Sequence, residues 1–186
     1  MKSNFLFIAL LITASLFFTA CEKDDPEPIV EPELITTLKY NLTPVSGGTT
    51  ITLNFQDLDG DGGNAPTITG GTLAANEIYT GTIELLNEAE SPVENITEEI
   101  EEEDEEHQFF FQSNISNLAI AYTDEDADGN PVGLNSTLTT GAAAAGSITI
   151  ILRHEPNKSA SGVSDGDVTN AGGETDIEVT FSVDVQ

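Results

Sequence analysis

The stretch "TDIEVTFSVDVQ" at residues 175–186 indicates the fold class more clearly than any other part of the chain. Its apolar residues occupy every second position, with polar residues between them: Ile177, Val179, Phe181, Val183 and Val185. Successive side chains of a β-strand point to opposite faces, so this period of two predicts a strand with one buried face.

Six further segments combine apolar and polar residues in a similar way and are separated by clusters of Gly, Asn, Asp and Pro, which favour turns. They are "LITTLKYNLT" (34–43), "TTITLNFQD" (49–57), "YTGTIELLNE" (79–88), "HQFFFQSN" (107–114), "NLAIAYTD" (117–124) and "SITIILRHE" (147–155). We therefore expect an all-β fold over residues 34–186: a single antiparallel, immunoglobulin-like β-sandwich of about seven or eight strands. A short helix within residues 92–106 is the only helix expected, and the Gly-Ala stretch at 139–147 predicts a turn.

The charge of the chain limits its partners. Five Lys and Arg residues stand against 33 Asp and Glu residues, a formal net charge of −28. Nucleic acids and anionic surfaces need basic partners. The strongly negative net charge therefore argues against nucleic-acid binding and favours the binding of cations. We expect the single arginine, Arg153, to pair with some of the carboxylates.

The first 20 residues have the composition of a secretory signal peptide. Lys2 provides a positive end, an apolar run follows, and the small residues Thr19 and Ala20 precede Cys21, the only cysteine. An uncleaved membrane anchor is the alternative, because the uncharged run from Asn4 to Ala20 approaches the length of the shortest membrane-spanning helices, about 17 residues. The small residues before cysteine favour cleavage.

The stretch "FTAC" at residues 18–21 resembles the lipobox of bacterial lipoproteins, in which the signal peptidase cuts before a cysteine that becomes lipidated. The following "CEKDDP" resembles the lipoprotein export signal of Bacteroidota, with Lys23, Asp24 and Asp25 in its charged positions. These resemblances imply that Cys21 anchors the protein to the outer membrane through lipid and that the domain faces the cell exterior. The alternative is that the charges only keep an extended linker solvated.

Residues 21–33 predict a flexible tether between lipid and domain. The segment "EKDDPEPIVEPE" is rich in proline and acidic residues, a composition that favours an extended spacer. The predicted organisation is a signal peptide at 1–20, a tether at 21–33 and a β-sandwich domain at 34–186.

Two loops carry the alternating aspartates of a calcium site. "DLDGDGGN" supplies Asp57, Asp59 and Asp61, and "DEDADGNP" supplies Asp124, Asp126 and Asp128. Carboxylates at alternate positions followed by glycine form the first half of a calcium loop, but neither loop has the closing glutamate of an EF-hand. Both are candidate calcium sites, and the alternative is that these residues simply form good hairpin turns.

The two histidines provide a second candidate site. His107 and His154 each adjoin acidic residues, in "EEHQ" and "RHEP", and His107 follows a run in which eight of the nine residues 98–106 are acidic. Two imidazoles with a carboxylate are suitable ligands for zinc or another transition metal. Because the two histidines are far apart in the sequence, the alternative is that they do not share a site and instead have separate roles at the surface or at strand ends. The acidic run is expected to lie at one edge of the folded domain, because it leads into the apolar residues 109–111.

No sequence motif names a reaction. The one GxSxG match, "GVSDG" at 162–166, lies in a Gly-, Ser- and Asp-rich loop instead of between a strand and a helix. We therefore expect a non-catalytic binding or accessory lipoprotein that serves an outer-membrane transporter or another surface protein. The alternative is a calcium-supported hydrolase that acts on glycans.

Overall fold

The computed structural model describes residues 34–60 and 62–186. The predicted signal peptide, the tether, the lipidation site Cys21, the export-signal residues Lys23, Asp24 and Asp25, and the candidate calcium ligand Asp61 lie outside the described residues.

The described chain contains ten β-strands, one α-helix and two short 3-10 helices. The strands are β1 (Thr37–Pro44), β2 (Ile51–Gln56), β3 (Thr67–Thr69), β4 (Gly71–Leu73), β5 (Ile78–Leu86), β6 (His107–Ser113), β7 (Ala119–Tyr122), β8 (Asn135–Thr139), β9 (Ala144–His154) and β10 (Glu174–Val185). The helices are α1 (Ile96–Glu102), η1 (Val163–Asp165) and η2 (Val168–Asn170).

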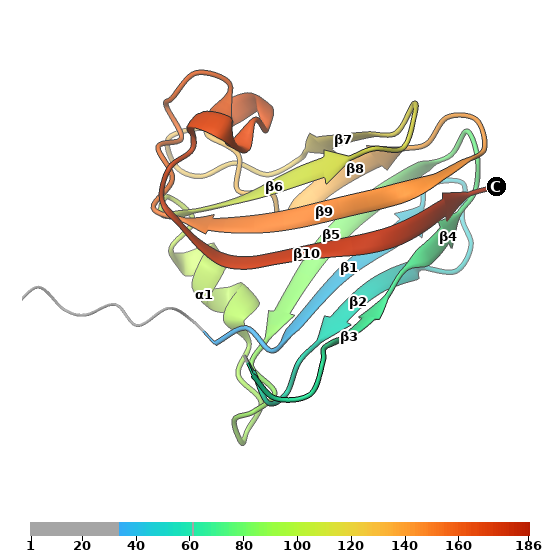
Figure 1. Ribbon diagram of the computed structural model, residues 1–186. Helices are drawn as coiled ribbons and strands as arrows, with labels where there is room; N and C mark the ends of the chain where they lie inside the picture. Colours follow the sequence, from blue (N-terminus) through green and yellow to red (C-terminus); the bar gives the residue numbers. More distant parts are fainter. Residues whose placement is uncertain (1–33, 61) are drawn as a thin grey trace, which may run out of the picture. The chain divides into compact units, whose positions relative to one another are not determined.

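The strands form two sheets, which lie face to face in Figure 1. One sheet has six strands in the order β3-β2-β1-β5-β8-β7, and the other has four in the order β4-β10-β9-β6. All pairings are antiparallel except that of β10 with β4, which is parallel. The all-β class is confirmed. Purely antiparallel pairing was expected, but the pairing is mixed because β10 and β4 are parallel.

All seven expected strand segments form strands, and three further strands bring the total to ten. The additional strands are β3 and β4, each of three residues, and β8, with the mostly polar sequence "NSTLT". The Gly-Ala stretch was expected to be a turn, but Ala144 to Ser147 belong to β9, because they pair in register with β10.

A hydrophobic core fills the space between the two sheets. The alternating residues of β10 all lie in this core, with exposed fractions of 8% or less, and Phe181 is fully buried. Leu38, Tyr40 and Leu42 of β1 contribute to the same core from the other sheet. The alternating apolar side chains of these strands therefore face inward, as expected.

Part of the outer face of the four-stranded sheet, over β6 and β9, is covered by the segment between β9 and β10. Phe110 of β6 and Ile151 of β9 pack against Val163 and Ala171 of this segment in a second, smaller apolar cluster. This packing explains why Phe109, Phe110 and Phe111 occur consecutively: Phe109 faces the main core and Phe110 the smaller cluster.

The expected short helix is α1, which contains part of the acidic run. Its Ile96 and Ile100 are buried in the main core, while the acidic side chains around them remain largely outside. The run leads into β6, an edge strand of its sheet, as expected. Within the described residues, no helix combines the length and apolarity needed to cross a membrane.

Replacing Phe181 by alanine is expected to lower the free energy of unfolding by about 3–5 kcal/mol, because it leaves a cavity in the main core. Urea denaturation monitored by circular dichroism measures this change. Ser182→Ala, at an exposed neighbouring position, is the control and should change stability by less than about 0.5 kcal/mol. Equal effects of the two substitutions would contradict the assignment of β10 to the core.

Candidate functional site

Strand pairing brings the two histidines together. His107 begins β6, His154 ends β9, and the two residues are paired in the ladder between these strands. Their rings stack with centroids 4.8 Å apart and planes 14° from parallel. The sequence left open whether the histidines meet, and the structure places them side by side.

His107 is directed into the protein. Its side chain is 2% exposed, Nδ1 lies 3.1 Å from the carbonyl oxygen of Glu103, and Nε2 lies 4.0 Å from Oδ2 of Asp176. Burial disfavours the charged form of each group. It therefore lowers the pKa of His107 and raises the pKa of Asp176. Both ring nitrogens of His107 therefore face other protein groups.

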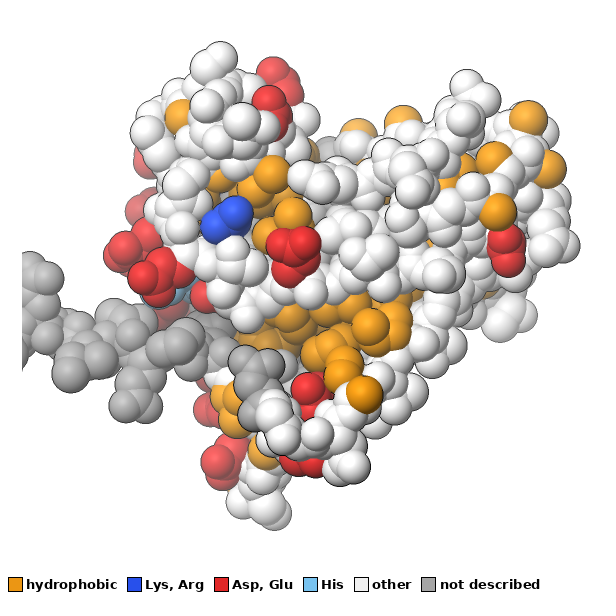
Figure 2. Space-filling model, viewed as in Figure 1, with side chains coloured by type: hydrophobic (Ala, Val, Ile, Leu, Met, Phe, Trp, Pro, Cys, Tyr) orange, Lys and Arg blue, Asp and Glu red, His pale blue; other side chains and the backbone are white. Residues whose placement is uncertain are grey.

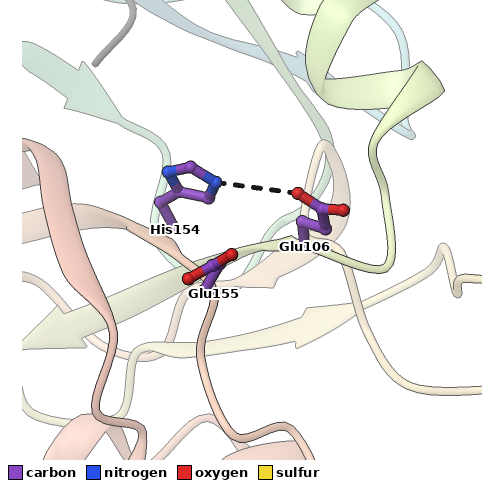
Figure 3. Close-up of side chains that lie close together, drawn as sticks. All are labelled: Glu106, His154 and Glu155. Atoms are coloured by element: carbon purple, nitrogen blue, oxygen red, sulfur yellow. Dashed lines mark ion pairs between the residues drawn. The ribbon is translucent and has the colours of Figure 1, made fainter. Parts of the chain in front are cut away.

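His154 lies nearer the surface, with two glutamates around it (Figure 3). Its side chain is 17% exposed, and its Nε2 is 3.7 Å from Oε2 of Glu106. One ligand atom from each of Glu106, His154 and Glu155 lies within 4.8 Å of the other two. This trio, which we call the Glu-His-Glu cluster, could hold a metal ion, and His107 is not a member of it.

The backbone holds the two glutamates of the cluster close together. The N–H of Glu155 donates a hydrogen bond of 2.6 Å to the carbonyl oxygen of Glu106. Glu155 has a positive φ of 50°, a left-handed conformation that is unfavourable for a residue with a Cβ. Gly173 packs directly against the carbonyl of His154, where a larger residue would clash. These contacts fix the turn that places Glu155 beside His154.

The Glu-His-Glu cluster offers donor types that zinc accepts, one imidazole and two carboxylates. Ligands at about 2.0–2.1 Å around tetrahedral zinc lie about 3.3 Å apart. Nε2 of His154 and Oε2 of Glu106 are 3.7 Å apart, and the three ligand atoms lie only within 4.8 Å of one another, so the side chains would have to move closer to bind zinc. Three protein ligands leave one coordination position for water or a bound group.

The acidic run adds negative charge near the cluster. Burial raises the pKa of Glu99 in α1, and repulsion from Glu94 and Glu103 raises it further. A cation bound near these carboxylates would relieve their mutual repulsion.

The first candidate calcium loop uses its carboxylates to stabilise its own turn. Oδ1 of Asp57 accepts a hydrogen bond from the N–H of Gly60, and Oδ2 of Asp59 accepts two from Asn64. The hydrogen bonds from Asn64 lower the pKa of Asp59. These contacts are typical of Asx turns, and the calcium prediction for this loop stays a prediction.

The second candidate calcium loop already contains a cation from the protein itself. Asp124 accepts hydrogen bonds from the N–H groups of Gly133 and Asn135, and the N–H of Asp128 donates to Oδ1 of Asp126. Oδ2 of Asp126 lies 2.8 Å from the ammonium of Lys158, in a salt bridge whose two side chains are 1% and 6% exposed. Calcium at this loop also stays a prediction, and it would compete with lysine for Asp126.

The Asp126–Lys158 pair also connects distant segments. Nζ of Lys158 donates a second hydrogen bond to the carbonyl oxygen of Asp104 in the acidic run. Burial alone would raise the pKa of Asp126, but Lys158 and the backbone N–H groups of Asn130 and Asp128 outweigh it and lower the pKa. The lysine thus joins the covering segment between β9 and β10 to the loop after β7.

Three of these residues were not identified as functional candidates from the sequence. Glu106 and Glu155 adjoin the two histidines in the sequence, but this adjacency alone does not predict that either residue is a ligand. Lys158 gave no signal, and Arg153 was expected to pair with carboxylates instead. Arg153 forms no salt bridge with any residue that the structure describes, and its Nε is buried without a hydrogen bond there.

Replacing Lys158 by methionine is expected to lower the free energy of unfolding by about 3–5 kcal/mol, because Asp126 is left buried without its partner. The double variant Asp126→Asn/Lys158→Met should recover much of this loss, since neither residue then carries a charge. Urea denaturation of the variants measures both effects. A double variant no more stable than Lys158→Met would contradict this account of the pair.

The pH dependence of stability provides a second test of the Asp126–Lys158 pair. The pKa of Asp126 is lower in the folded protein, so its stabilising contribution is present above the unfolded pKa of about 3.9 and is lost as the pH falls through the folded value. The stability difference between the wild type and Asp126→Asn should therefore shrink as the pH is lowered from 7 to 3. A difference that grows over this range would contradict the assignment.

No protein-family model matches this chain, and neither a curated protein nor a solved structure is significantly similar to it. The functional argument therefore depends on the residues and their geometry.

Proposed function

We propose that this protein is a lipid-anchored, non-catalytic binding module of the outer membrane and that it binds a divalent transition metal such as zinc. The observation that carries the metal assignment is the Glu-His-Glu cluster, whose ligand atoms lie within 4.8 Å of one another. Imidazole and carboxylate groups suit zinc, and the net charge of −28 favours cations in general.

The location of the protein is proposed from the sequence around Cys21. The small residues before this cysteine and the charged residues Lys23, Asp24 and Asp25 support a lipid anchor and display on the cell exterior. With such an anchor, the domain needs no apolar face to associate with the membrane. By analogy with surface lipoproteins, an outer-membrane transporter is the proposed partner.

The fold supports a binding role in a general way. We propose that the two sheets form an immunoglobulin-like sandwich in the sense of layered architecture, which presents loops and strand ends at its edges. Calcium at the aspartate loops is a further proposal. The alternative function, a calcium-supported glycan hydrolase, stays a prediction, and no observation on the described residues favours it over binding.

Zinc titration of the purified full-length protein in detergent micelles should show one saturable site by isothermal calorimetry. Replacing His154 by asparagine or Glu106 by glutamine is expected to weaken zinc binding at least about tenfold, because each removes one of three ligands. Calcium should compete poorly, since it prefers six to eight oxygen ligands.

Glu102→Gln is the matched control for zinc binding. Glu102 is an exposed member of the same acidic run but lies outside the Glu-His-Glu cluster. It should leave the affinity nearly unchanged. Equal weakening by Glu102→Gln and Glu106→Gln would show that zinc is attracted by the acidic run in general, and the proposed site would then be wrong.

Replacing Cys21 by serine is expected to abolish lipid attachment, because the thiol that accepts the lipid is lost. Metabolic labelling with an alkyne-tagged fatty acid, followed by membrane fractionation, measures this effect. Incorporation of label into the Cys21→Ser variant would contradict the proposed anchor.

A further inference from the structure

A groove lies between the two sheets on the side where β10 and β3 face each other. Its volume is about 610 Å³, and its lining includes apolar residues from the start of the domain, β2 and β10, among them Ile35, Phe55 and Ile177. Figure 2 shows hydrophobic side chains in the hollow between these strands, with acidic side chains on both sides of it. The lining of the groove contains no member of the Glu-His-Glu cluster, but its Asp176 lies 4.0 Å from His107, whose ring stacks on that of His154.

The groove also contains a buried carboxylate that accepts no hydrogen bond from the described residues, although the ring of His107 lies beside it. Asp176 lines the groove, its side chain is 4% exposed, and its Oδ2 accepts no hydrogen bond from the residues that the structure describes. A β-bulge between Thr175 and Ile177 inserts Asp176 into β10, which explains how two successive side chains are both directed inward. Asp57 and Glu178 place negative charge in the lining.

One edge of β10 beside the groove has no strand partner. Val183–Val185 pair with β4, but within the described chain residues 174–182 pair only with β9 on their other side. The backbone groups on the unpaired edge are available to another strand, the arrangement used when an extended peptide adds to a sheet.

From these observations we infer that the groove binds an extended peptide segment that pairs with the free edge of β10 and inserts a basic side chain between the sheets. The aliphatic stem of a lysine or arginine would pack against Phe55 and Ile177, and its charged end would lie near Asp57 and Asp176. Charge complementarity selects this occupant: a second copy of the chain carries the same strongly negative charge, and the tether preceding Leu34 is rich in acidic residues.

The test measures binding of a labelled peptide, acetyl-Thr-Val-Thr-Val-Lys-Val-Thr-amide, to the full-length protein in detergent micelles by fluorescence anisotropy. Replacing the peptide lysine by glutamate should weaken binding at least about tenfold, and N-methylation of its backbone should do the same. Hydrogen–deuterium exchange should show new protection within residues 174–182. Absence of binding, or equal binding of the lysine and glutamate peptides, would overturn the inference.

Variants of the protein locate the site. Asp176→Asn should weaken binding of the lysine peptide at least about tenfold, whereas Asp184→Asn, at an exposed position of β10 beside β4, should not. Equal effects of the two variants would overturn the inference. Peptide binding that appears only after deletion of residues 22–33 would identify the tether as the occupant and would also overturn the inference. A β10-mediated dimer detected by light scattering would identify a second copy as the occupant, with the same consequence.

Discussion

The pairing of β9 with β6 on one side and β10 on the other is the constraint on which the rest of the structure depends. This register places His154 opposite both His107 and Glu174, so it brings together residues that are far apart in the sequence. The inner faces of the three strands complete the main core, and the outer face supports the covering segment. The bulge in β10 belongs to the same ladder and directs Asp176 inward.

The second general constraint is the excess of negative charge. With only five Lys and Arg residues, the chain cannot pair most of its carboxylates with its own cations. It places one lysine, Lys158, in a buried pair with Asp126, and the aspartate loops use backbone N–H groups to stabilise their other carboxylates. The carboxylates around His154 form no salt bridge with a lysine or arginine among the described residues, and this supports the metal ion that we propose at that position.

The sequence predicted the parts of the fold that depend on local pattern. The stripe in β10 and the six other expected strand segments follow from the period of two, and Ile96 and Ile100 explain the short helix. Strands β3 and β4 were missed because three residues are too few to show a period. The bulge at Asp176 was missed because alternation predicts an outward-facing side chain there.

The sequence predicted which types of residue form the candidate site, but not which individual residues belong to it. Acidic neighbours of the two histidines suggested a metal site, yet only the strand register shows that His154 joins Glu106 and Glu155 while His107 turns inward. Zinc K-edge X-ray absorption of the zinc-loaded protein tests this central claim most directly. The account predicts one imidazole nitrogen together with carboxylate oxygens at about 2.0–2.2 Å; two imidazoles on the same ion, or oxygen ligands alone, would contradict it.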